Sequence, residues 1–318
     1  MSHSMFMPRG SMPTSRLLQS AAFLSVYFIW GSTYLAIRVA VVSMPPLLLA
    51  GTRYSLAGGL VYALMRLLGT RAPTFAEWQR ASVSGLLMAT LSNGLVTLAE
   101  QHVHSNLAAL LIACTPLFVA LLDWARPGGK RPTSRQAFGL ALGFFGMLLL
   151  VGLGRSGVHP SDFWGALALV GAALGWALGI LFTRHRPGHP NSIMASAQQM
   201  FAGGVALLCL ALLRGEFQAG LLGTIAADAW FAFGYLTLFG SIIAFSAFTW
   251  LVSVSTPTSV STVAYVNPVV AVALGWCLLG ERLSAQSVWG GAAIVLAIIV
   301  LSRDGRARGG KPLPGSAE

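Results

Sequence analysis

The chain has 318 residues, of which 55% are hydrophobic and only 9% are charged. This ratio leaves too little polar surface to cover a water-soluble body of that size. The formal net charge of +11 is compatible with nucleic-acid binding, but the positions of the basic residues, described below, exclude that class.

Apolar stretches of about 20 residues, long enough to cross a bilayer, recur from Leu17 to Leu301 with short polar breaks between them. They are continuous and too long for the alternating segments of about ten residues that build membrane β-barrels. Helices are therefore the expected spanning elements, and no domain is expected outside the membrane. The ten predicted spans are 17–38, 46–68, 80–100, 105–124, 135–154, 162–183, 191–213, 228–252, 257–279 and 284–302.

The first span follows Arg9 and Arg16 directly. Its apolar run is long and no small-residue cleavage site follows it, so we expect an uncleaved helix and not a signal peptide. The two ends of the chain lie outside the predicted spans, as tails that cover 1–16 and 303–318.

Basic residues predict the orientation of the spans. If the first tail is cytoplasmic, most Lys and Arg residues fall in cytoplasmic segments, and only Arg53 lies well inside a span. This bias follows the positive-inside rule and places both tails in the cytoplasm. The few basic residues on the outer side are Arg38, Arg155, Arg214 and Arg282.

Cys114, Cys209 and Cys277 all lie within predicted spans, are odd in number and lack metal-ligand spacing. We expect them to be apolar packing residues. No metal or other cofactor is expected.

Four sets of residues recur in the same order at spacings between 145 and 152 residues, which indicates an internal repeat. The predicted copies are 17–154 and 162–302, joined by a linker at 155–161. The matched sets are Trp30 with Trp176, Ala57-Gly58-Gly59 with Ala202-Gly203-Gly204, Thr115-Pro116 with Asn267-Pro268, and Gly129, Arg131 and Gly139 with Gly280, Arg282 and Gly290.

Each copy contains five predicted spans, so the second copy must enter the membrane from the opposite side. Inverted repeats of this kind place a substrate site near the membrane midplane between the copies. The expected fold is all-α, with ten transmembrane helices arranged as two inverted five-helix repeats around a central cavity. This architecture is typical of secondary transporters that work by alternating access.

Several motifs together resemble the drug/metabolite transporter superfamily, specifically its bacterial EamA-type members with paired five-helix domains. The resemblance covers essentially the whole membrane region and implies export or exchange of small metabolites, often amino acids, across a bacterial inner membrane. The motifs are Trp30-Gly31-Ser32, Arg53, TPLFVALL from Thr115, YVNPVVAV around Asn267 and Pro268, and GERLS from Gly280.

Polar side chains inside hydrocarbon are costly unless they face the bundle interior or a wet cavity. In the third span, Asn93, Thr97 and Glu100 recur at spacings of three or four residues and share one helix face. An alternative for the small hydroxyl groups is hydrogen bonding between closely packed helices. For the larger amides, cavity and packing roles stay equally open. Further candidates in the seventh and ninth spans are Gln198, Gln199, Tyr265 and Asn267.

Trp30 and Trp176 lie about halfway along their spans, away from the interfaces where tryptophan usually anchors. They are candidates for the walls or gates of a central pocket, and packing of two bulky side chains is the equally weighted alternative. Tyr34 extends the face of Trp30 toward the outside. Trp250 in the eighth span is a weaker candidate.

Pro116 and Pro268 lie inside the fourth and ninth spans, where proline removes a backbone N–H and frees a carbonyl. Each is predicted to be a bending point or to offer a carbonyl to a substrate ammonium group. The alternative is a static kink.

Arg53 lies roughly 10 Å in from the outer end of its helix, and Glu100 lies near the outer end of the next one. One interpretation is a pair that fixes the two helices together. The functional interpretation assigns a substrate carboxylate to Arg53 and a proton or a substrate ammonium group to Glu100.

The leading function is export of small neutral or zwitterionic metabolites, most plausibly amino acids with aromatic or hydrophobic side chains. Alternatives are exchange of other metabolites or drugs, a channel-like facilitator and a membrane-embedded enzyme. The enzyme class is disfavoured because His102 and His104 lack metal-ligand spacing and are expected to be solvated. The expected partners are the substrate and the lipid bilayer, with a monomer as the expected state.

Overall fold

The computed structural model describes residues 16–126, 132–151, 160–255, 263–281 and 284–309. These residues form helices and turns, without a strand among them. Within them, seven helices are long and apolar enough to cross a membrane, and three shorter apolar helices accompany them. The predicted all-α membrane class is therefore confirmed. The three shorter helices are 134–150, 266–279 and 285–301.

The first half of the chain provides the helices that lie before residue 152. Three of them, α3, η1 and α4, follow one another without a break and together form the predicted third span. The helices are α1 (Arg16–Ala40), α2 (Pro46–Leu67), α3 (Phe75–Gly85), η1 (Leu86–Asn93), α4 (Gly94–Ala99), α5 (Ser105–Ile112), α6 (Thr115–Ala125) and α7 (Ser134–Val151).

The second half repeats this order. Here α11, η2 and α12 follow one another without a break and form the predicted eighth span. The helices are α8 (Pro160–His185), α9 (Ser192–Leu213), α10 (Leu221–Thr224), α11 (Ala227–Tyr235), η2 (Leu236–Ala244), α12 (Phe245–Val254), α14 (Val263–Leu279) and α15 (Ala285–Gly309).

Two segments, η1 and η2, are π-helical and lie at corresponding places in the two halves. A π-helical segment winds more widely than an α-helix and leaves its carbonyls in a different register, which is why such segments are frequent at functional sites. The two halves therefore share a π-helical irregularity of the backbone in addition to their repeated residues.

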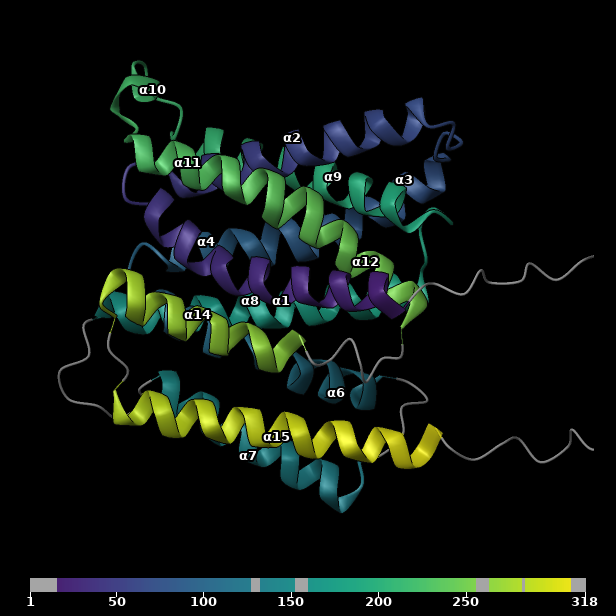
Figure 1. Ribbon diagram of the computed structural model, residues 1–318, viewed down its shortest axis with the longest axis vertical. Helices are drawn as coiled ribbons and strands as arrows, with labels where there is room; N and C mark the ends of the chain where they lie inside the picture. Colours follow the sequence, from purple (N-terminus) through teal and green to yellow (C-terminus); the bar gives the residue numbers. More distant parts are fainter. Residues whose placement is uncertain (1–15, 127–131, 152–159, 256–262, 282–283, 310–318) are drawn as a thin grey trace, which may run out of the picture.

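Helices α2 and α9 lie side by side in the bundle (Figure 1). Gly51 faces Leu208, and Gly58 faces Phe201 and Ala197. Residue numbers rise along one helix as they fall along the other, so the two helices are antiparallel. Since α2 and α9 carry the matched Ala-Gly-Gly motifs, corresponding helices of the two halves run in opposite directions, as inverted repeats require.

Helices α7 and α15 form a second such pair (Figure 1). A Cβ atom on Gly146 would lie 2.7 Å from the backbone oxygen of Gly290, and a Cβ atom on Gly290 would lie 3.0 Å from that of Gly146. Close approach of the two backbones thus depends on glycine on both sides.

Helix α1 begins and α15 ends at the same end of the bundle (Figure 1). The described chain therefore starts and finishes on one side of the bundle. The cytoplasmic location of that side stays a prediction.

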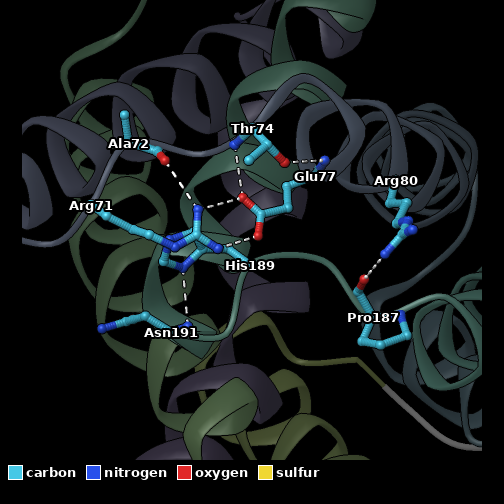
Figure 2. Close-up of polar contacts among 8 residues, drawn as sticks. All are labelled: Arg71, Ala72, Thr74, Glu77, Arg80, Pro187, His189 and Asn191. Carbon is cyan, nitrogen blue, oxygen red and sulfur yellow. Dashed lines mark hydrogen bonds and ion pairs between the residues drawn. The ribbon is translucent and has the colours of Figure 1, made fainter.

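A capping box starts α3 (Figure 2). The Thr74 hydroxyl accepts a hydrogen bond from the backbone N–H of Glu77, and the Glu77 carboxylate accepts one from the backbone N–H of Thr74. The same carboxylate binds both terminal nitrogens of Arg71. These hydrogen bonds raise the pKa of the exposed Arg71 guanidinium. They also fix the segment that connects α2 to α3 to the first turn of α3.

Candidate functional site

The matched tryptophans, Trp30 on α1 and Trp176 on α8, contact each other through their rings. Their ring centroids are 5.8 Å apart and the rings are nearly perpendicular. Phe245 packs against both rings, and Phe248 lies 4.8 Å from Trp30. Edge-to-face packing of this kind is favourable in itself, so these four rings form one packed aromatic cluster between the two halves of the chain.

The motif Trp30-Gly31-Ser32 joins α1 to the second half of the chain. The indole N–H of Trp30 donates to the backbone oxygen of Gly240 in η2, at 3.1 Å. The Ser32 hydroxyl lies 2.6 Å from the hydroxyl of Tyr235. Gly31 lets α14 approach, since a Cβ there would overlap the side chain of Val270. Each of the three motif residues therefore makes a different contact with the second half.

The hydrogen bond of the indole predicts a modest effect for Trp30→Phe. This change keeps an aromatic ring but leaves the Gly240 carbonyl without its donor, and we expect a loss of about 1 kcal/mol in unfolding free energy. Thermal unfolding of the purified protein measures it. Trp289→Phe is the control, because Trp289 is 71% exposed; equal shifts for the two variants would contradict a role for the hydrogen bond.

Arg53 is buried in the first half of the chain. One terminal nitrogen donates to the Tyr54 hydroxyl at 2.9 Å and to Oδ1 of Asn93 at 3.3 Å, and its guanidinium carbon lies 4.4 Å from the centre of the Tyr54 ring. Its Nε has no hydrogen-bond partner among the described residues. Asn93, one of the predicted site residues, thus positions the predicted cation.

Glu100 is completely buried, and neither of its carboxylate oxygens has a hydrogen-bond partner in the described part of the chain. Arg38 donates to its backbone oxygen and not to the carboxylate. Glu100 does not form the expected ion pair with Arg53. The Arg53 guanidinium donates to Tyr54 and Asn93 instead. Arg38 and, to a smaller extent, Arg53 are close enough to the Glu100 carboxyl group to interact with it electrostatically.

Other predicted site residues surround this group. The Thr97 hydroxyl donates to the backbone oxygen of Asn93 at 2.7 Å, so it is hydrogen-bonded within its own span. Tyr34 is half-buried and interacts electrostatically with Glu100 and Tyr54. Tyr34, Arg53, Asn93 and Glu100 therefore belong to one polar group, which we call the Arg53–Glu100 group.

The candidates from the second half are more scattered. Gln198 is fully buried, and neither atom of its amide has a partner among the described residues; the same holds for Oδ1 of Asn267. Gln199 is also buried, and Trp250 packs against the small apolar cluster around Val26. Pro268 lies inside α14, while the side chain of Tyr265 lies outside the described part.

The fourth predicted span is interrupted. It consists of α5 and α6 with a break at 113–114, and Pro116 lies in the first turn of α6, not in the middle of one helix. The hydroxyl of Thr115 donates to the backbone oxygen of Ile112, the carbonyl that proline would leave without a donor, at 2.7 Å. At Pro116 the freed carbonyl is therefore satisfied within the chain, which argues against its use for a substrate.

The remaining candidates agree only in part with expectation. Cys114 is buried, whereas Cys209 and Cys277 are exposed on their helices, so the packing role holds for the first alone. His102 and His104 are exposed, as predicted. Among the residues described, no group of three or more His, Cys, Asp or Glu side chains is arranged to hold a metal ion.

Two buried carboxylates outside the predicted site are Glu216 and Glu281, of which Glu281 belongs to the GERLS motif. Glu216 accepts a hydrogen bond from the backbone N–H of Leu48 at the start of α2, at 2.8 Å. Glu281 accepts hydrogen bonds from the backbone N–H groups of Ser105 and Asn106 and from the Ser105 hydroxyl, at 2.9 to 3.2 Å. Each carboxylate thus caps a helix of the other half.

The signal for these caps is a repeated Gly-Glu pair. Gly215 and Gly280 both have positive φ, of 72° and 64°, and each follows the end of a helix in the second half. Glycine adopts this conformation readily and so turns the chain at a helix end. The glutamate that follows is then directed back toward a neighbouring helix.

The family profile that describes EamA-like transporters matches the chain twice, at 19–152 and 163–303. The uncharacterized inner membrane transporter YedA of Escherichia coli K12 is 38% identical over 282 residues, which cover 88% of this chain and 89% of that protein. The uncharacterized transporter YoaV of Bacillus subtilis is 24% identical, covering 87% and 94%. Protein PecM of Dickeya dadantii is 26% identical, covering 86% and 88%.

A solved crystal structure supports the fold independently. It has a TM-score of 0.63 and 19% sequence identity, and the match covers 92% of this chain and 100% of that one. At this identity the likeness concerns the fold alone. The double family match and the relative at 38% identity carry the assignment: the chain belongs to the EamA-like transporter family, within the drug/metabolite transporters, and is a membrane transporter of small molecules.

Proposed function

We propose that the chain exports small zwitterionic metabolites, amino acids first among them, across a bacterial inner membrane by alternating access. The observation that carries the proposal is the Arg53–Glu100 group. It contains a buried cation and a buried carboxylate on neighbouring helices, and the Arg53 Nε and both Glu100 carboxylate oxygens have no hydrogen-bond partner among the described residues. The carboxylate and ammonium groups of an amino acid complement this pair of charges.

The aromatic junction supports the mechanism. Trp30 and Trp176 occupy corresponding places in the two halves and are in contact, so a movement of one half against the other changes their separation. Their rings also offer an apolar surface to an aromatic or hydrophobic side chain. Alternating access requires the substrate pathway to be closed at one place, here the contact between Trp30 and Trp176, while it is open at another.

The first test is counterflow in proteoliposomes that contain the purified chain. We expect saturable exchange of at least one labelled amino acid when the vesicles are preloaded with the same compound. Failure of the whole amino-acid panel would refute the substrate class, and flux that rises linearly with concentration would indicate a channel.

The role of Arg53 is tested by pairing each transported amino acid with the amine that lacks its carboxylate. Arg53→Gln is expected to weaken the apparent affinity for the amino acid roughly 10- to 100-fold, since a hydrogen bond to a charged group contributes about 1.5–3 kcal/mol, and to change that for the amine little. Arg214→Gln is the control, because Arg214 is exposed. An equal loss for both compounds would contradict carboxylate recognition.

Glu100→Gln separates coupling from binding. If Glu100 carries a proton, the variant should lose accumulation driven by a pH gradient and keep counterflow, which needs no net proton movement. If Glu100 binds the ammonium group instead, both activities should fall. An unchanged pH profile with normal counterflow would exclude Glu100 from either role.

A further inference from the structure

An open surface cavity of about 380 Å³, lined mostly by exposed residues, lies between α3 and α8, away from the Arg53–Glu100 group. Arg80 is in the second turn of α3, and Arg186 follows directly after the last residue of α8. The cavity therefore lies at the level where the spans end and lipid headgroups begin. Its lining residues are Ala76, Gln79, Arg80, Phe182 and Arg186.

The cavity is lined by two cations and no carboxylate of the described chain. Glu77 is on the same helix, but Arg71 and the start of α3 occupy its carboxylate, which lies away from Arg80 (Figure 2). The salt bridges between described residues involve neither Arg80 nor Arg186. Among the residues that the structure describes, no carboxylate thus compensates the positive charge of the cavity.

The Arg80 guanidinium is held in place. One of its terminal nitrogens donates to the backbone oxygen of Pro187 at 3.0 Å (Figure 2), which leaves the other N–H groups for a ligand. Arginine donors match the oxygens of a phosphate group, and a planar guanidinium loses less entropy for each hydrogen bond that it forms than a flexible lysine ammonium does.

The surroundings favour a ligand with an apolar part. Phe182 and Ala76 contribute apolar surface to the cavity, and Val83, one turn deeper than Arg80 on the same face of α3, is 39% exposed. Deeper between the helices, the hydroxyls of Ser84 and Thr183 are 2.9 Å apart and join α3 to α8. A headgroup in the cavity would leave its acyl chains beside Val83.

We propose that this cavity binds the phosphate group of an anionic phospholipid, with Arg80 and Arg186 as its cationic ligands. Basic cavities between helices at the membrane boundary are suited to such headgroups. Because α3 belongs to the first half of the chain and α8 to the second, one bound lipid would link the two halves at this end of the bundle.

The test uses the full chain in neutral detergent, with thermal unfolding as the readout. Phosphatidylglycerol added to the micelles should raise the unfolding temperature by about 3 °C over phosphatidylcholine at the same mole fraction, since a ligand that binds only the folded state stabilises it. Arg186→Gln should remove at least half of this increase. Arg184→Gln, which changes the same charge two residues away and outside the lining, should keep it.

Three results would overturn the proposal: equal stabilisation by the two lipids, an equal loss in Arg184→Gln, or the same increase with inorganic phosphate in place of the lipid. The last would identify a site for a free anion. Native mass spectrometry is the second measurement: phosphatidylglycerol should remain bound to the wild type and be lost from Arg186→Gln. Retention on that variant would also refute the site.

Discussion

Gly58→Ala is expected to lower the free energy of unfolding by about 3 kcal/mol, at the upper end of the cost of overpacking a core. A Cβ atom at this position would overlap the backbone nitrogen of Phe201 and would lie 2.7 Å from the backbone oxygen of Ala197. Backbone atoms of α9 cannot move away as a flexible side chain can. The helices α2 and α9 would have to separate, although alanine favours a helix more than glycine does.

The neighbouring glycine provides the control. At Gly59 the nearest atoms to an added Cβ belong to the ring of Phe201, at 3.8 Å, which is ordinary contact. Gly59→Ala should therefore be neutral or stabilise the protein by up to about 1 kcal/mol through helix propensity. Thermal unfolding and the yield of folded protein in detergent measure both variants, and equal behaviour would contradict close backbone contact at Gly58.

This contrast also shows what the repeat signal predicts. The Ala-Gly-Gly motifs were identified by their matched spacing, and the structure places the second motif on the helix that faces the first: a Cβ on Gly204 would overlap the backbone nitrogen of Ser55, in α2. Likewise Trp30 and Trp176, matched only by position, are in ring contact. In these two cases, residues matched between the halves by spacing alone lie next to each other in the structure.

Interactions that depend on three-dimensional packing could not be predicted in this way. Arg53 binds Tyr54 and Asn93 and not Glu100, because helical phase restricts which residues share a face but does not rank partners within reach. The wide turns of η1 and η2 have no local sequence signal, since a π-helical segment reflects packing around it. A bend at Pro116 was predictable from proline alone, whereas the hydrogen bond from the Thr115 hydroxyl to the freed carbonyl of Ile112 was not.

Glu281→Ala is expected to have the second large effect, a loss of about 3 kcal/mol in unfolding free energy. The change would leave the buried N–H groups of Ser105 and Asn106 without an acceptor, at about 1–3 kcal/mol each, and would remove a negative charge from the start of α5. Gly275 leaves room for the carboxylate, since a Cβ there would lie 2.5 Å from Oε2 of Glu281. Both helices thus accommodate the Glu281 carboxylate: α5 donates hydrogen bonds to it, and Gly275 of α14 leaves space for it.

Asp228→Ala is the matched control for Glu281→Ala. Asp228 is also a carboxylate at the start of a helix and accepts a hydrogen bond from the backbone N–H of Ala229, but it is exposed, so its loss should cost well under 1 kcal/mol.

In the double variant that combines Glu281→Ala with Ser105→Ala, the two changes should be strongly non-additive, because the Ser105 hydroxyl also donates to Glu281. Additive losses would mean that Glu281 acts through the α14–α15 turn alone. A shared loss would show that the connection after α14 in the second half holds the start of α5 in the first.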